Sequence, residues 1–186
     1  MAAQVHAVPR RGRHARHLLL VVGLLAAGCA WADGSPCLAL TEEDGLQPLA
    51  GCQFVDGRLQ LEPRALAALS FDADGLAPVH AGGGFHYVKA DGRQLPVITF
   101  DNGPDDVVEG LVRGRVGQRI GYFDTGFRQA FPATFDFGWA FEDGVARVCN
   151  GCTRGPPDED GHVAMVGGTW HRIDRTGQPA YQIDLP

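Results

Sequence analysis

The feature that most constrains the fold of this chain is a degenerate repeat of about 35 residues. Its matches are Phe85, Tyr87 and Phe100-Asp101 with Ile120, Tyr122 and Phe135-Asp136 at an offset of 35, Gly110 and Arg113 with Gly144 and Arg147 at an offset of 34, and a partial further copy that begins at Trp170. A period of this length is typical of arrays of small supersecondary units, each of which needs neighbours to bury its apolar face. Such arrays usually bind partners rather than catalyse reactions, so the repeat indicates an architecture and a broad class of function.

Each copy has the pattern of short antiparallel strands. An aromatic or branched strand leads into a turn glycine, which is Gly92, Gly126 or Gly177 in the three copies. Glycine adopts positive φ without a steric penalty, as tight hairpin loops require. A second strand follows, and a third begins at Leu111 or Val145. We therefore expect an all-β fold, a meander or solenoid-like array over residues 71–186.

The array is interrupted once. The last two copies are spaced by 50 residues rather than 35, and the additional residues, at about 150–168, are rich in Pro, Gly and acidic side chains. That composition predicts a surface loop inserted between strands. We expect this insertion to carry a specific contact, because it is where the repeat is broken.

Residues 33–70 are expected to form an N-terminal cap. Asp33–Gly51 is polar and rich in turn residues, and Asp56-Gly57 between two apolar runs predicts a hairpin. Glu62–Leu69 is the one convincing helix, with Pro63 near its first position.

Residues 1–32 have the pattern of an export signal. Four arginines and no acidic residue precede the apolar run Leu18–Ala27, which is too short for a permanent membrane span. Ala30-Trp31-Ala32 fits cleavage by ordinary signal peptidase, which we favour. The alternatives are a lipobox that ends at Cys29, which would make the protein an outer-membrane lipoprotein, or no cleavage. We expect a periplasmic or secreted protein.

The charge of the chain argues against polyanionic partners. Lys and Arg number 16, of which four lie in the signal segment, so 12 basic side chains face 22 acidic ones in the mature chain, a net charge near −10. Such a charge disfavours binding to nucleic acid or to anionic lipid. No segment of the mature chain is apolar enough to predict a transmembrane span.

The cysteines predict disulfide bonds. Of the five, Cys29 is removed or lipidated in an exported protein, which leaves Cys37, Cys52, Cys149 and Cys152. An even number in an oxidising compartment indicates disulfides with three possible connectivities, of which we favour the local one. The pair Cys149 and Cys152 also fits a redox motif or half of a zinc site, but it follows a strand rather than opening a helix. A structural staple is therefore favoured.

The repeats resemble the WG (KWG) repeat family. The motif Ile120-Gly121-Tyr122-Phe123-Asp124, followed by Gly126, Pro132, Phe135-Asp136 and Gly144–Val148, has the order of the family unit. Trp170–Asp174 with Gly177 is a second match, and Phe85–Val88 with Gly92 and Pro96 is a third, with His171 and His86 where the family has glycine. The resemblance implies an all-β module of bacterial exported proteins with no shared catalytic residues.

Other chemistry-bearing residues have structural explanations. The histidines His80, His86, His162 and His171 form no metal-binding motif, and packing or turn roles are favoured. Asp72-Ala73-Asp74-Gly75 begins like a calcium loop but lacks its later ligands, so a turn is favoured. Six aromatic residues recur at strand positions, and we expect most in the core and some along a groove: Phe100, Phe135, Phe137, Trp139, Phe141 and Trp170.

The sequence thus predicts a non-catalytic binding or scaffolding module of the bacterial envelope, with a protein or envelope component as its partner. We expect no catalytic, cofactor-binding or metal-binding residues. The alternatives are a periplasmic thiol-disulfide protein that uses Cys149 and Cys152, and a structural envelope lipoprotein.

Overall fold

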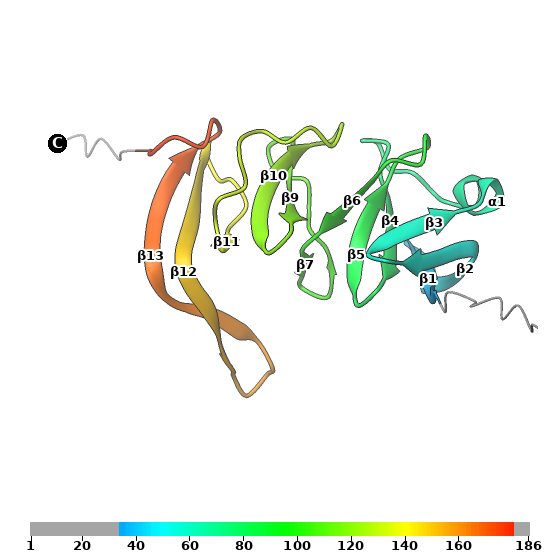
Figure 1. The fold of residues 1–186 in the computed structure, drawn as a ribbon, viewed down its shortest axis with the longest axis horizontal. Helices are drawn as coiled ribbons and strands as arrows, with labels where there is room; N and C mark the ends of the chain where they lie inside the picture. The colour runs from blue at the N-terminus through cyan, green and yellow to red at the C-terminus, as the bar shows by residue number, and fades with distance from the viewer. Residues whose placement is uncertain (1–33, 181–186) are drawn as a thin grey trace, which may run out of the picture. The chain divides into compact units, whose positions relative to one another are not determined.

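Antiparallel β-strands make up almost all of the regular structure in the computed structural model, which describes residues 34–180 (Figure 1). These residues belong to one compact unit. The expected signal segment 1–32 and Cys29 lie outside the described residues. Within the described range, no helix is both long enough and apolar enough to cross a membrane.

The strands form three antiparallel sheets. The largest has the order β10-β9-β6-β5-β4-β1-β2-β3, the second β11-β12-β13, and the third pairs β7 with β8. Their bounds are β1 Ser35–Thr41, β2 Gly45–Val55, β3 Arg58–Leu61, β4 Ala77–Ala81, β5 Gly84–Val88, β6 Gln94–Val97, β7 Thr99–Phe100, β8 Gly103–Pro104, β9 Leu111–Val116, β10 Arg119–Asp124, β11 Phe137–Gly138, β12 Val145–Pro157 and β13 Val163–Asp174. The all-β prediction is confirmed.

The N-terminal region differs in part from the prediction. The helix α1, Pro63–Ala67, is shorter than expected but has proline in its first turn. The Asp-Gly hairpin joins β2 to β3, and Asp56 and Gly57 both have positive φ, at 50° and 79°. The expectation of a turn-rich entry over Asp33–Gly51 is wrong for most of the segment, because β1 and β2 pair there and bury the disulfide. Polar side chains on the exposed faces of these strands gave the segment the composition of a loop.

The expected inserted loop at 150–168 is also mostly strand. β12 and β13 pair from Val145–Asp174 to Pro157–Val163, and only the residues between Pro157 and Val163 form a loop. Figure 1 shows the resulting long β12–β13 hairpin. Strands exposed on both faces carry few apolar residues, so their sequence does not have the alternation that identifies a half-buried strand.

One kind of turn occurs at the repeat spacing. After β5, β10 and β13, the N–H of Lys89, Asp124 or Asp174 donates to the carbonyl four residues later, and each residue's own carbonyl accepts the N–H three residues later. The carboxylates of Asp124 and Asp174 also accept N–H groups two and four residues on. Asp72 and Asp158 accept the same pair of N–H groups, so the expected turn at Asp72 is confirmed.

The two repeated tyrosines have the same environment. Tyr87 and Tyr122 are buried, and their hydroxyls donate to the carbonyls of Asp105 and Trp139 at 2.9 and 2.7 Å. Burial raises the pKa of Tyr87 to about 12 and raises that of Tyr122 further. Neutral hydroxyls with a carbonyl acceptor satisfy their hydrogen-bonding needs inside the core.

The core has three apolar clusters along the chain. The first surrounds Cys37, Cys52, Ala65, Val79 and Val88, the second Leu76, Phe85, Tyr87, Val112 and Phe123, and the third Ile98, Ile120, Tyr122, Phe141, Val148 and Ile173. The Cys37–Cys52 disulfide thus lies inside the first cluster, where it cross-links β1 to β2.

A buried ion pair lies between the second and third clusters. Asp105 and Arg113 are 1% and 3% exposed. The carboxylate accepts the Arg113 backbone N–H at 2.7 Å, Nε at 3.0 Å and a third donor, Nη2. Nη1 of Arg113 donates to the carbonyl of Gly138 at 3.0 Å, which ties β9 to β11. Burial raises the pKa of Asp105, and the hydrogen bonds and charge of Arg113 oppose that rise.

Replacement of Arg113 alone should lower the stability of the protein more than replacement of both Arg113 and Asp105. We expect Arg113→Met to lower the free energy of unfolding by about 3–5 kcal/mol, because it leaves the Asp105 carboxylate buried without its cation. The double variant Asp105→Leu with Arg113→Met should recover part of that loss. Urea unfolding followed by circular dichroism measures both. The exposed Arg128→Gln is the control and should change little, and equal losses in the single and double variants would contradict the expectation.

Candidate binding groove

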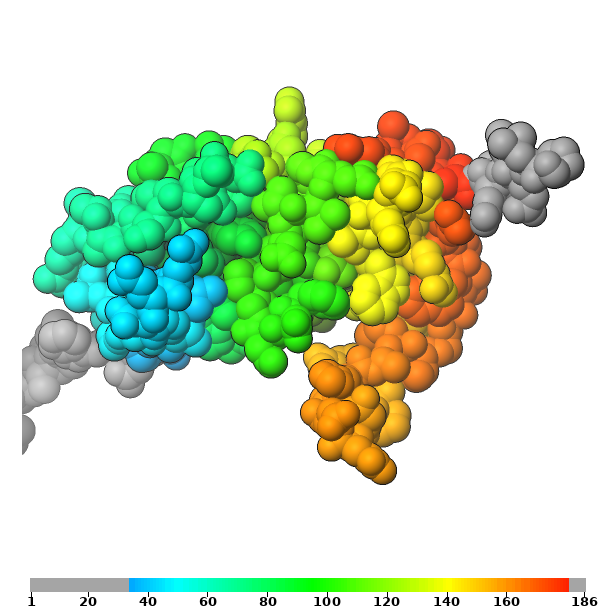
Figure 2. Space-filling view, turned by 180° about the vertical axis from the view of Figure 1, so that it is seen from behind, coloured from blue at the N-terminus to red at the C-terminus, as the bar shows by residue number. Residues whose placement is uncertain are grey.

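A groove of about 530 Å³ lies between the β12–β13 hairpin and the end of the large sheet. We call it the aromatic groove. Its lining residues are Ile98, Thr99, Phe100, Arg115, Ile120, Asp136, Phe137, Trp139, Arg147, Arg154, Val163, Ala164, Met165 and Trp170. Figure 2 shows a hollow between the β7–β8 region, in green, and the tip of the β12–β13 hairpin, in orange. Segments that are far apart in the sequence therefore meet at one surface.

Four aromatic side chains form a continuous row in this groove. Phe100 contacts Trp139, Trp139 contacts Phe137, and Phe137 contacts Trp170, with ring centroids 6.2, 5.2 and 6.3 Å apart. All three contacts are edge-to-face, a favourable arrangement for aromatic pairs. Phe100 and Trp139 are 44% and 42% exposed. Neighbouring exposed aromatic residues on a folded surface mark an interaction site.

The backbone explains why these rings share one surface. Phe137 lies in β11 and Trp139 directly follows the strand, two residues on, so both side chains lie on the same side of the extended chain and Gly138 lies on the other. A β-carbon at Gly138 would collide with the Tyr122 hydroxyl, so glycine lets β11 approach the core. Phe100 precedes the Asp101-Asn102 turn, where both residues have positive φ and join β7 to β8.

Arginines give the groove a positive charge. Arg115, Arg147 and Arg154 line it and are exposed, and the guanidinium of Arg147 lies 5.3 Å from the centre of the Trp170 ring. Asp136 is the acidic side chain among the lining residues, and it pairs with Arg119. The groove is thus locally cationic on a chain whose net charge is −6.

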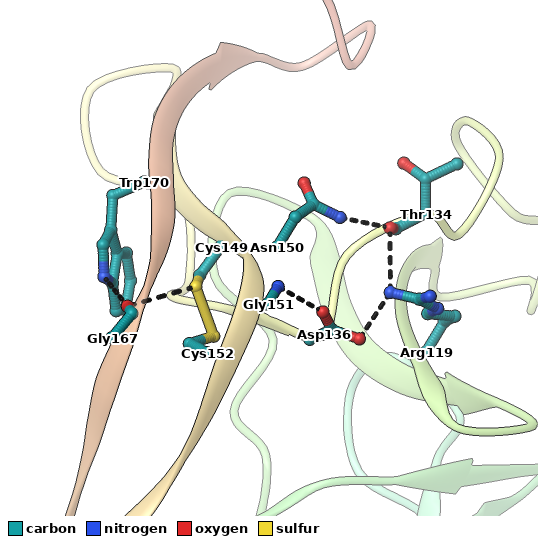
Figure 3. The surroundings of a disulfide bond; sticks show 9 residues. All are labelled: Arg119, Thr134, Asp136, Cys149, Asn150, Gly151, Cys152, Gly167 and Trp170. Atoms are coloured by element: carbon teal, nitrogen blue, oxygen red, sulfur yellow. Dashed lines mark hydrogen bonds and ion pairs between the residues drawn. A yellow bond between two sulfur atoms is a disulfide. The ribbon is translucent and has the colours of Figure 1, made fainter.

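The second disulfide lies at the base of the hairpin, beside the groove (Figure 3). Cys149 and Cys152 are separated by Asn150 and Gly151, which also belong to β12. The Gly151 N–H donates to Asp136 Oδ2 at 2.6 Å, and Asn150 Nδ2 donates to the carbonyl of Thr134 at 2.7 Å. The disulfide therefore fixes the point at which the hairpin continues beyond β11 and joins it to the groove wall.

The opposite strand is adapted to this disulfide. Gly167 and Gly168 have φ of 69° and 71°, and a β-carbon at Gly168 would lie 2.7 Å from the Cys149 sulfur. The carbonyl of Gly167 accepts the indole N–H of Trp170 at 3.1 Å. The two glycines therefore admit the disulfide and help to fix the orientation of Trp170.

The expected cysteine pairing is present, Cys37 with Cys52 and Cys149 with Cys152. Cys149 and Cys152 are 0% and 6% exposed, and both lie on β12. A reactive cysteine needs access and an electropositive environment such as a helix N-terminus. The burial of both sulfurs favours a structural staple over a redox pair.

The two repeat-equivalent histidines have different environments. His86 is 5% exposed in β5, whereas His171 is exposed on β13. The Nδ1 atom of His86 has no hydrogen-bond partner in the described structure, and burial lowers the pKa of this histidine. Packing in the core therefore explains His86, but it does not explain the exposed His171. Among residues 34–180, no three His, Cys, Asp or Glu side chains are grouped as metal ligands.

The sequence identified the aromatic residues better than the polar ones. Four of the six recurring aromatic residues line the groove, while Phe141 is buried and Phe135 is partly buried. Arg115 and Arg154 were missed, and Arg147 was noted only as a repeat match. Arg113 and Arg115 are two residues apart on one strand, a pattern that could have indicated a cationic strand face. The sequence does not say which of the two arginines is buried.

A second hollow, of about 680 Å³, lies by the β1–β2 turn. Glu42, Glu43, Asp44 and Asp72 contribute acidic groups to it, and its large apolar members Leu76 and Tyr87 are buried. Glu42, Glu43 and Asp44 are exposed, and the Asp72 carboxylate already accepts the N–H groups of Asp74 and Leu76. The aromatic groove is therefore the stronger candidate site.

Comparison of the chain with models of known protein families, with curated proteins and with solved structures finds no match. The WG-repeat resemblance therefore stays a prediction, and the argument for function depends on the geometry of the groove.

Burial of His86 should make the stability of the protein depend on pH. The folded state holds the pKa of His86 below its ordinary 6.5, so the unfolded chain takes up a proton first as the pH falls. The contribution of His86 is complete above about pH 6.5 and is lost as the pH falls through the lower pKa of the folded state. We expect His86→Leu to flatten the fall in unfolding free energy between about pH 7.5 and 5.5. His80→Leu is the control, and an unchanged slope in the His86 variant would contradict this explanation.

The Cys149–Cys152 disulfide should resist reduction while the protein is folded. Because both sulfurs are buried, we expect it to stay intact in glutathione buffers poised at about −200 mV, where structural disulfides persist. Alkylation and intact mass give the fraction that is reduced. Rapid, reversible reduction would instead support a thiol-disulfide protein.

Proposed function

We propose that this protein is a non-catalytic binding module of the bacterial cell envelope, exported and built from degenerate WG-like repeats, and that the aromatic groove is its contact surface. The observation that carries the proposal is the row of Phe100, Trp139, Phe137 and Trp170 beside three arginines. Tryptophan and arginine are enriched among residues that dominate binding energy at protein interfaces.

The repeat supports the architectural part of the proposal. The turns at Lys89, Asp124 and Asp174 share one hydrogen-bond pattern at spacings of 35 and 50 residues. The turns Glu109-Gly110 and Asp143-Gly144 also share positive φ values, of 50° and 74°, and 51° and 74°. Recurring turns of this kind are what an array of similar hairpin units requires.

The two disulfides support the export part of the proposal. Disulfides form and persist in oxidising compartments and are rare in the cytosol of most organisms. Both pairs are local, with sequence separations of 15 and 3, and both are buried. A rigid groove wall is an advantage to a binding module, because less side-chain and loop freedom is lost on association.

Capture of a partner from a bacterial envelope extract tests the proposal. We expect the disulfide-intact wild type to retain a partner that Trp139→Ala loses, with a decrease in affinity of about 30-fold or more, as for exposed tryptophan residues that become buried when a partner binds. Leu46→Ala is the matched control, because Leu46 is similarly exposed, at 41%, but does not line the groove. Equal capture by all three proteins would place the contact surface elsewhere.

A further inference from the structure

We infer that the aromatic groove takes a short acidic peptide segment of a partner protein, in which apolar side chains are flanked by carboxylates. This inference rests on the proposed function, because it names the chemistry of the ligand for the same groove.

The charge of the groove carries the first step. Arg115, Arg147 and Arg154 are exposed and line it, and among the described residues no ion pair is formed by any of the three. The guanidinium group binds carboxylates through two parallel hydrogen bonds. Three such groups spread along one groove match a segment with several carboxylates.

The rest of the surface limits the length of an anionic ligand. The described range of the chain is acidic overall, with acidic turns at Glu42–Asp44 and Asp158–Asp160. A long polyanion that ran from the groove along the hairpin would meet the acidic turn Asp158–Asp160, which lies in the chain between the lining residues Arg154 and Val163, and would be repelled. A short acidic segment can place its charges on the three arginines alone.

The apolar lining favours a peptide over a sugar or a nucleotide. Ile98, Val163 and Met165 line the groove together with the aromatic row. A sugar presents many hydroxyl groups, but Asp136 is the one carboxylate among the lining residues, and it already accepts from Arg119 and from the Gly151 N–H. Aliphatic and thioether groups next to aromatic rings instead form an environment for apolar side chains.

The size of the groove agrees with this occupant. About 530 Å³ is within the range of sites that bury small ligands, and it holds a few side chains rather than a folded domain. The edge-to-face contacts hold Phe137 and Trp139 together before any ligand binds. Arginine clusters recognise acidic peptide motifs in other proteins, and aromatic-lined grooves recognise extended peptides.

Selection from a random peptide display library against the disulfide-intact protein tests the inference. We expect the selected peptides to be enriched in Asp and Glu next to Leu, Ile, Phe or Trp, relative to the unselected library. Fluorescence anisotropy of synthetic copies should show about 10-fold weaker binding to Arg154→Gln, and weaker binding as salt is added. Arg128→Gln is the matched control, because it removes an exposed arginine outside the groove and should bind like the wild type.

Two further probes separate the possible ligands. Polygalacturonate and a labelled dT oligonucleotide present anionic charge without apolar side chains, and we expect neither to compete with the selected peptides at low micromolar concentration. If either probe binds more tightly than the selected peptides, and Trp139→Ala or Arg154→Gln weakens that binding, the peptide inference is overturned. The proposed binding function would still stand. Selected peptides without acidic enrichment, or unaffected by Arg154→Gln, also overturn it. If the envelope extract in addition yields no partner that depends on Trp139, the proposed function fails as well.

Discussion

The buried pair of Asp105 and Arg113 is the interaction on which the arrangement of the sheets depends. Each charge loses its hydration on folding, so each must be matched by hydrogen bonds from the protein. The carboxylate has both the guanidinium and the backbone N–H of Arg113 as donors. The Asp105 carbonyl accepts the Tyr87 hydroxyl, and Arg113 Nη1 donates to Gly138. Strands β5, β9 and β11 are therefore connected through one polar centre.

The aromatic groove is built around the same centre. The Arg113 guanidinium lies 5.0 Å from the centre of the Phe100 ring, a cation–π contact, and its hydrogen bond to Gly138 holds the residue between Phe137 and Trp139. On the other wall, the Cys149–Cys152 disulfide and the Gly151 bond to Asp136 fix the base of the hairpin that carries Arg154. Exposed aromatic residues are thus held on a rigid support, which favours binding with a small loss of conformational freedom.

The predictive power of the sequence differed between kinds of residue. Turns were predictable because their chemistry is local, as at Asp56-Gly57 and at Asp72, and disulfide partners close in sequence were predictable for the same reason. The strands over Asp33–Gly51 and 150–168 were not, since strands that leave much of their surface exposed have the polar composition of loops. Arg113 and Arg115 have the same chemistry and lie on one strand, yet only the first is buried, because Asp105 lies within its reach.

By itself, the sequence determined the class of the fold, the local turns and the set of aromatic residues from which the row in the groove is drawn. Those properties follow from strand periodicity, from glycine and aspartate in turns, and from aromatic content, all of which act over a few residues. Only the tertiary structure decided which aromatic side chains are exposed and which cations face them. Phe141 and Trp139 are two residues apart, but one is buried and the other is exposed, at 2% and 42%. Which of the two side chains is buried depends on contacts between segments of the chain that are not adjacent in sequence, because β11 is positioned by β12 and by Arg113 of β9.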